Sequence, residues 1–334
     1  MSLKNIFKRW EFILLILILA ELAFFGILSP GFLNLGNLLY STNDFAHVLI
    51  VAIPFTLVVI TGGIDISVPS TMGLVSIIFG LTWKFAGFPI WLALLAALAT
   101  GILAGAINGL LVANTDITPI VLTLGTQFLY SGLATGLSGS IGASGYNGIG
   151  GFPDGFNNLA YGMVFGLPNA LVFSLLFAAA IGVFLAKTST GRSLYLVGVN
   201  RNAALFSGIK VKRSTVTTYV LTGLGAAVAG IYLTAYFTSS RSDIGHDALM
   251  PILTAVVLGG TDINGGAGTI LGTIIAAVLL GYLKQGLMTI GVTSDVSQVM
   301  VGIILIVTIV GKVLAGNAAQ ARLNRAALKK IGSS

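Results

Sequence analysis

Long apolar runs with almost no charged residues follow one another along nearly the whole of this sequence. They lie at about residues 10–28, 45–61, 66–82, 90–112, 118–138, 163–186, 214–236, 247–259, 268–285 and 294–313. A helix needs about 20 mostly apolar residues to cross a bilayer, and lipid offers no partner for an unpaired backbone group. The sequence therefore predicts an all-α, polytopic membrane protein of about ten transmembrane helices that forms a single domain over residues 1–334.

The composition excludes other classes of protein. Of the 334 residues, 56% are hydrophobic and only 8% are charged, whereas about 25% are charged in soluble domains. A transmembrane barrel would show short alternating segments instead of long runs. The chain has no cysteine and two histidines, so we expect no disulfide, metal site or cofactor in it. The net charge is +7. In a membrane protein the placement of the positive charges along the chain indicates its orientation, and we expect no nucleic-acid partner.

Positive charge is distributed unevenly among the loops. Loops rich in Lys and Arg stay in the cytoplasm. With a cytoplasmic N-terminus, ten spans place Lys84, Arg241 and Lys284 outside and every other Lys and Arg inside. We therefore expect both termini to be cytoplasmic and the first run to be an uncleaved helix. The basic tail 314–334 is expected to form an amphipathic helix on the inner membrane surface.

A segment at residues 53–67 reappears at residues 250–264. A proline, two glycines, an aspartate and the following isoleucine align without a gap. Because six spans separate the copies, both have the same sidedness, which is the parallel type of transporter repeat. The repeat suggests a pore-forming subunit with related halves at about 10–112 and 214–313. A chance match between apolar segments is the alternative.

Each copy of the repeat contains a glycine pair that predicts a break in its helix: Gly62-Gly63 and Gly259-Gly260. Glycine tolerates positive φ, and the backbone groups that a break frees must be buried in protein or line a cavity. Asp65 and Asp262 follow the pairs and are expected to cap the next helix. Contact with the substrate or with a neighbouring subunit is the alternative.

Sequence motifs of enzymes are missing. Residues 265–273 are rich in glycine but lack the lysine of a phosphate-binding loop, so the chain is not expected to hydrolyse ATP alone. There is also no His-Glu-x-x-His and no Gly-x-Ser-x-Gly, and we do not expect an enzyme. Glu21 lies inside the first run, where an ionisable group is costly. It is either a proton-coupling carboxylate or a protonated or hydrogen-bonded group that faces other helices.

The segment 187–213 is predicted to carry a short helix. Asn200 can cap a helix that starts at about residue 201 and continues through Ala203, Ala204 and Phe206, and Gly208 can end it in a left-handed turn. An exposed helix with an Ala and Phe surface suits docking into a cleft on a soluble partner. A solvated basic loop that only sets the topology is the alternative.

These segments together resemble the permeases of sugar-type ABC importers. The resemblance covers about residues 12–313 and rests on residues 62–65, 104–112, 117–126 and 259–260, and, in the segment 187–213, on Gly191, Arg192, Gly198, Asn200, Ala203, Ala204, Ser207, Gly208 and Ile209. Residues 41–45, 145–153, 239–243 and 280–287 most resemble one branch, the autoinducer-2 import permeases.

The resemblance implies a bacterial importer in the inner membrane with several further parts. A periplasmic binding protein would deliver a small sugar-like solute, and a second permease subunit, expected to be a paralogue, would complete the pore within membrane lipid. A cytoplasmic ATPase dimer that binds ATP and Mg would drive the cycle through the segment 187–213. A permease for ribose or another pentose, or an ion-coupled secondary carrier, is the alternative.

Polar residues in the predicted spans are candidates for the solute pathway. Asn108, Thr126 and Gln127 either line it or form hydrogen bonds between helices. His47 and His246 lie near the outer ends of the second and eighth runs. They either contact the binding protein or are ordinary interfacial side chains.

Overall fold

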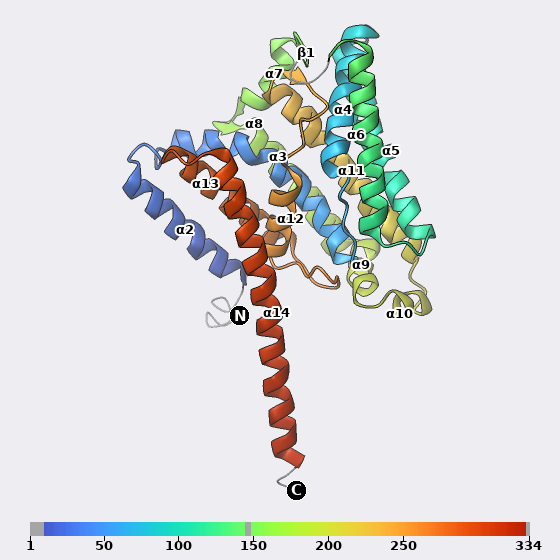
Figure 1. Cartoon of the computed structure of the whole chain (residues 1–334), viewed down its shortest axis with the longest axis vertical. Coiled ribbons are helices and arrows are strands. Elements are labelled where there is room, and N and C mark those ends of the chain that lie inside the picture. Colours follow the sequence, from blue (N-terminus) through green and yellow to red (C-terminus); the bar gives the residue numbers. More distant parts are fainter. Residues whose placement is uncertain (1–9, 144–147, 332–334) are drawn as a thin grey trace.

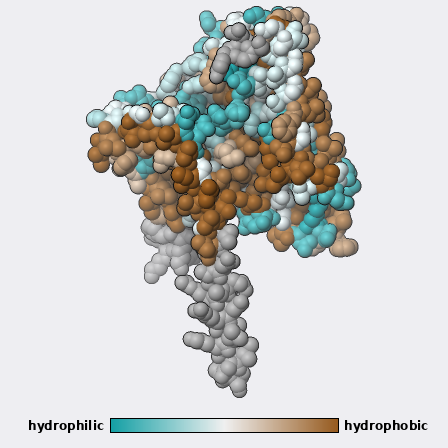
Figure 2. Space-filling model, in the orientation of Figure 1, coloured by the Kyte–Doolittle hydropathy of each residue, from teal (hydrophilic) through white to brown (hydrophobic). Residues whose placement is uncertain are grey.

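The computed structural model describes the backbone of residues 10–143 and 148–331, with side chains as far as residue 311 and at residue 314 (Figure 1). Within this part, nine helices are long and apolar enough to cross a membrane. They are α2 (Trp10–Leu28), α3 (Leu35–Ile60), α4 (Val68–Gly80) with its continuation η1 (Leu81–Phe85), α5 (Ile90–Asn114), α6 (Pro119–Ser140), α8 (Asn169–Lys187), α11 (Val211–Tyr236), α13 (Ile270–Thr289) and α14 (Ser294–Ile331). The predicted all-α, polytopic fold is confirmed, and Figure 2 shows hydrophobic residues across the middle of the molecule.

The shorter elements lie at the two ends of the bundle. One end, called here the α9 end, carries α9 (Ser189–Val199) and α10 (Arg201–Phe206) (Figure 1). The opposite end, called the α7 end, carries α7 (Asp154–Tyr161) and two antiparallel strand pairs. These pairs are β1 (Ile149–Gly150) with β4 (Ser239–Ser240), and β2 (Met163–Val164) with β3 (Leu167–Pro168).

The eighth predicted span is wrong in its length. The structure has only a ten-residue helix there, α12 (Leu249–Leu258), which rises about 15 Å at 1.5 Å per residue, half of a bilayer core of about 30 Å. Residues 241–248 before it are non-helical and include charged side chains. Such backbone is tolerated at membrane depth only when protein surrounds it, and α12 packs against α3, α13 and α14.

Two other boundaries also differ from the prediction. The second helix begins at Leu35 rather than at residue 45, because the Asn34 side chain accepts hydrogen bonds from the Gly36 and Asn37 amides and caps it. The sixth long helix begins at Asn169 rather than at residue 163, because β2 and β3 form a hairpin over the first part of that run. Helix α14 continues into the basic tail as far as Ile331. The prediction that this tail is amphipathic depends on side chains that lie outside the described residues.

Helices α5 and α11 approach each other closely through glycines. A Cβ atom added to Gly223 of α11 would lie 2.2 Å from the Gly101 carbonyl oxygen of α5, and one added to Gly105 would lie 2.3 Å from the Tyr219 carbonyl oxygen. Small residues let helix backbones pack closely in membranes, where the hydrophobic effect does not drive association. This contact holds the centre of the bundle together.

Replacing Gly223 with valine should therefore weaken the fold. The added methyl groups meet backbone that cannot move aside, so we expect a loss of about 1–3 kcal/mol in the free energy of unfolding. Gly132 of α6 is a matched control, because a Cβ atom added there meets no atom within 4 Å. Denaturant unfolding in detergent measures both variants, and an equal effect of Gly223→Val and Gly132→Val would contradict the packing argument.

Candidate functional site

The short helix predicted in the segment 187–213 is present as α10. Asn200 adopts an extended conformation, and its Oδ1 accepts a hydrogen bond from the Ala203 amide at 2.9 Å. Gly208 follows the helix with φ of 78°. The preceding helix, α9, is capped in the same way by Thr188, whose Oγ1 accepts from the Gly191 amide at 2.9 Å. The Arg192 guanidinium donates to the Lys187 carbonyl oxygen at 3.2 Å.

The exposed surface of α10 differs from the prediction at Ala204. Ala204 is only 3% exposed and packs with Val197 and Val211. Phe206 is 90% exposed and Leu205 is 60% exposed, while Ala203 and Ser207 are also on the exposed side. The expected docking surface therefore contains Leu205 and Phe206, and Ala204 instead anchors α10 to α9 and α11.

Both predicted glycine breaks are tight helix ends. Gly62 and Gly260 have φ of 78° and 99°. The next amide in each case donates five residues back, from Gly63 to the Val58 carbonyl and from Thr261 to the Val256 carbonyl. This is the Schellman arrangement, in which a residue with positive φ closes the helix end. The sequence alignment pairs Gly62 with Gly259, whereas the residue with positive φ in the second turn is Gly260, so the two turns differ by one residue from the alignment. The wider repeat stays a prediction.

The two aspartates that follow these turns do not cap the next helices as predicted. Asp65 Oδ1 accepts from the Ser67 amide at 3.0 Å, and Asp262 Oδ1 accepts from the Asn264 amide at 2.9 Å. Each bond spans two residues and tightens a turn. The residue that caps α13 is Thr269, whose side chain accepts from the Gly272 amide, and the side chain of Ser67 makes no capping bond to α4.

Helix α9 packs on the end of α3 and on the loop that follows the second turn. The Ile60 carbonyl oxygen at the end of α3 accepts the Gly266 amide of the loop after α12 at 2.8 Å. A Cβ atom added to Gly198 of α9 would lie 1.9 Å from this same oxygen and 2.3 Å from the Gly266 nitrogen. The Tyr195 hydroxyl donates to the Gly268 carbonyl oxygen at 2.9 Å. Three backbone segments therefore meet at one point, which we call the α9 junction.

Asp65 also belongs to a buried polar cluster that joins three helices. Its Oδ1 accepts from the Ser67 hydroxyl at 2.6 Å, and the Asn108 side chain of α5 donates to the Ser67 hydroxyl oxygen at 2.7 Å. The Tyr130 hydroxyl of α6 donates to Asn108 Oδ1 at 3.3 Å. Burial raises the pKa of the Asp65 carboxyl, and the hydrogen bonds from Ser67 and Asn108 lower it in part. Asn108 thus bonds between helices, one of its two predicted roles.

The other predicted intramembrane residues have separate surroundings. Thr126 is buried and donates to the Thr123 carbonyl oxygen at 3.2 Å. Gln127 Oε1 and Glu21 Oε1 are buried atoms without a hydrogen-bond partner among the described residues. Glu21 lies on α2 and Gln127 on α6. The structure therefore does not bring Glu21 together with the Asp65 cluster.

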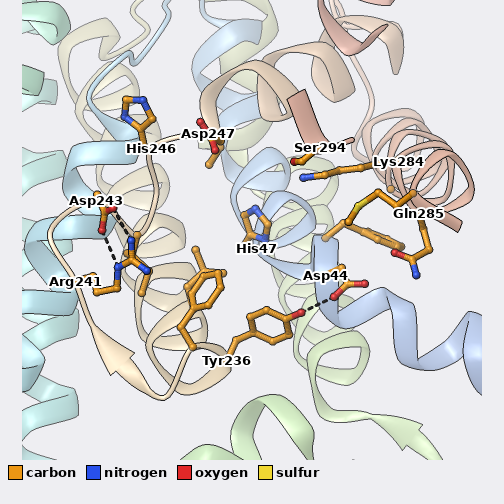
Figure 3. A pocket seen from close by; sticks show the side chains of 17 residues that line it. Asp44, His47, Tyr236, Arg241, Asp243, His246, Asp247, Lys284, Gln285 and Ser294 are labelled. Atoms are coloured by element: carbon orange, nitrogen blue, oxygen red, sulfur yellow. Dashed lines mark hydrogen bonds and ion pairs between the residues drawn. The ribbon is translucent and has the colours of Figure 1, made fainter. Parts of the chain in front are cut away.

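A large cavity lies at the α7 end, between the outer parts of α3, α11 and α13 and the segment before α12 (Figure 3). Its volume is about 760 Å³. The side chains that line it include those of Asp44, His47, Tyr236, Arg241, Lys284 and Gln285. A second cavity of about 420 Å³ lies beside it and shares Asp44 and Gln285.

Hydrogen bonds and ring contacts fix several side chains of this cavity. The Tyr236 hydroxyl donates to Asp44 Oδ1 at 2.5 Å, and Arg241 and Asp243 form an ion pair at 2.6 Å. The Tyr161 ring stacks on the Tyr236 ring with centroids 5.8 Å apart, and its hydroxyl donates to the Tyr236 carbonyl oxygen at 2.5 Å. Burial, followed by the neighbouring Tyr40 and Asp44, raises the pKa of the Tyr161 hydroxyl.

No motif in the sequence marks this cavity by itself, although a signal for it is present. Three of the four segments with the branch-specific resemblance, 41–45, 239–243 and 280–287, contribute side chains to its lining. Part of the fourth, 145–147, lies outside the described residues. His47 and His246 both line the cavity as well. Among the described residues, no group of three or more His, Asp or Glu side chains is arranged to hold a metal ion.

Comparison with known proteins decides the family. The model of the family "Branched-chain amino acid transport system / permease component" matches residues 37–309. The chain belongs to this permease family. It is 46% identical over 303 residues to the "Autoinducer 2 import system permease protein LsrD" of Escherichia coli K12, and equally to those of Shigella flexneri and Escherichia coli O157:H7. The match covers 91% of this chain and 92% of each relative. No solved structure matches the chain significantly.

The Asp65 cluster of this permease yields a stability prediction. An asparagine at position 65 keeps an oxygen that can accept from the Ser67 amide, and it avoids a buried charge, so Asp65→Asn should change the free energy of unfolding by less than about 1 kcal/mol. Asp65→Ala removes the acceptor of the Ser67 amide and hydroxyl and should cost about 1–3 kcal/mol. Denaturant unfolding in detergent compares the two. Equal losses for both variants would show that the negative charge itself is required.

Proposed function

We propose that this permease is a transmembrane pore subunit of an ATP-driven ABC importer that takes up autoinducer-2. The observation that carries the proposal is the 46% identity to LsrD, which extends over 91% of this chain and 92% of the relative. A relative that matches almost end to end supports the same assembly and the same solute class. The exposed α10 and the cavity at the opposite end of the bundle fit the two tasks of such a subunit.

The orientation of the chain in the bacterial inner membrane follows from its charges. The α9 end carries Lys187, Arg192, Arg201, Lys210, Lys212 and Arg213. Positively charged loops stay in the cytoplasm, so the α9 end and both termini are cytoplasmic and the α7 end faces the periplasm. A periplasmic binding protein then meets the end that carries the cavity, and a cytoplasmic ATPase dimer with ATP and Mg meets α10.

The α9 junction supplies a route for the mechanical coupling. When ATP closes the ATPase dimer, a shift of α10 moves α9, since Ala204 packs between Val197 and Val211. Gly198 then pushes on the Ile60 carbonyl and on the loop after α12, which turns α3 and α12 together. The gate would open and close as α3, α9, α10 and α12 change between two packed arrangements. The nucleotide and the delivered solute must favour them differently, because a ligand that binds both equally shifts nothing.

A second permease subunit, a paralogue of this chain, completes the pore. Import of ribose or another pentose by the same mechanism is the alternative solute class. An ion-coupled carrier is the alternative mechanism, and Glu21 would be its proton site. The three possibilities differ in the solute, the partner proteins and the energy source that uptake requires.

Reconstitution into liposomes separates the alternatives. We expect the chain alone to move no solute, and uptake of labelled autoinducer-2 to require the paralogous permease, the ATPase, ATP and the binding protein together. Uptake by this chain alone on a proton gradient, lost in Glu21→Gln, would contradict the ABC mechanism. ATP-dependent uptake of ribose without uptake of autoinducer-2 would keep the mechanism and change the solute.

The exposed ring of Phe206 gives a sharper test of the coupling. Phe206→Asp replaces an apolar contact with a charge, so we expect uptake to fall at least tenfold while the amount of the chain in the membrane stays normal. Phe165→Asp is the matched control, because Phe165 is equally exposed but lies in the turn between β2 and β3 at the other end. Uptake rates and immunoblots of membranes measure both. Normal uptake in Phe206→Asp would remove α10 from the mechanism.

A further inference from the structure

We propose that the cavity at the α7 end is a binding site for an uncharged, polyhydroxylated solute, formed by this single chain. The inference deepens the proposed function and rests on it for the direction of transport. The cavity volume of about 760 Å³ lies within the range of about 300–1,000 Å³ found for small-molecule sites. Figure 3 shows side chains of α3, α11, α13 and the loop before α12 around it, together with Ser294 at the start of α14.

The charges of the lining disfavour an anionic solute. Three carboxylates, Asp44, Asp243 and Asp247, stand against two cations, Arg241 and Lys284. Arg241 and Asp243 pair with each other at 2.6 Å. The remaining groups carry one excess negative charge, so an anionic solute gains no net attraction. A neutral solute with several hydroxyl groups can use acceptors and donors at the same time.

The hydrogen-bonding groups that remain suit such hydroxyls. Asp44 is exposed, and within the described part of the chain its Oδ1 alone is bonded, to the Tyr236 hydroxyl. Its Oδ2 can therefore accept from a solute hydroxyl. Lys284 offers donors, and Gln285 offers both a donor and an acceptor. Tyr236 is held by Asp44 and by the stacked Tyr161 ring, so its position is fixed before the solute arrives, which reduces the cost of ordering on binding.

The walls of this cavity lead to the α9 junction. Asp44 and His47 lie on α3, which ends at Ile60 in the junction. Ala248 lines the cavity immediately before α12, and α12 ends at the Gly260 turn. The cavity-lining part of α3 and the residue before α12 thus belong to elements that lead to the junction: α3 contacts α9 directly, and α12 is followed by the loop that α9 contacts. A rotation of α3 and α12 would change the shape of the cavity and release the solute.

Thiol labelling tests the site without relying on transport. The natural chain has no cysteine, so Gln285→Cys introduces a single thiol into the cavity lining. We expect autoinducer-2 at millimolar concentration to slow the reaction of this variant with a membrane-impermeant maleimide at least twofold in the assembled transporter. Asp154→Cys, on exposed α7, should react at an unchanged rate.

The outcomes of the labelling experiment each decide the proposal. Protection by ribose in place of autoinducer-2 supports the site and assigns it to pentoses. Protection by ribose 5-phosphate as strong as that by ribose would overturn the preference for a neutral solute. No protection by any of the three would overturn the site. If the intact transporter takes up solute with ATP yet shows no protection, the inference fails alone, whereas uptake without the ATPase would contradict only the proposed function.

Uptake kinetics add a second readout. Loss of a charged hydrogen-bonding partner costs about 1.5–3 kcal/mol, and 1.4 kcal/mol corresponds to tenfold in affinity. Asp44→Asn and Lys284→Gln should therefore raise the KM for uptake about tenfold or more and leave the maximal rate largely unchanged. Asp154→Asn serves as the control. A lower maximal rate at unchanged KM would place these residues outside the binding step.

Discussion

The constraint on which this structure depends is that lipid cannot satisfy a free backbone carbonyl or amide. Two helices, α3 and α12, end in buried residues, Ile60 and Leu258, that are followed by glycine turns, and each turn would leave such groups unpaired. The structure satisfies them with Schellman bonds and with the bond from the Gly266 amide to the Ile60 carbonyl. Because this bond is covered by Gly198 of α9, the segment that closes the helix ends is also the segment that continues into the exposed α10.

The same constraint explains the other end of α12. Charged residues such as Arg241, Asp243 and Asp247 precede this short helix and could not face lipid. They face a cavity that α3, α11 and α13 enclose. A helix of half the usual length therefore connects a polar cavity at one end of the bundle with a tight turn at the other. In the mechanism that we propose, this connection lets α12, together with α3, link the solute to the ATPase.

Much of the fold could be predicted from the sequence, since nine long apolar runs became helices and Asn200 capped α10. Hydropathy did not distinguish α12 from a full span, because its flanking non-helical residues are shielded by protein rather than by a longer apolar run. The burial of Ala204 follows from packing against Val197 and Val211, which no local pattern reveals. Asp65 meets Asn108 across 43 residues of sequence, so their contact, too, required the fold. The cavity is lined in part by three segments, 41–45, 239–243 and 280–287, which are far apart in the sequence and which each resemble the same branch of permeases.

We propose that α9 and α10 receive mechanical input from a nucleotide-hydrolysing subunit. A Phe206→Cys variant of the naturally cysteine-free chain, treated in intact cells with a photoactivatable thiol cross-linker, tests it most directly. We predict that the main cross-linked product contains the ATPase subunit of the importer and that its yield changes when ATP is depleted. If the cross-linked products contain no nucleotide-binding protein, or if an impermeant reagent labels this thiol from the periplasmic side, α10 does not receive input from an ATPase.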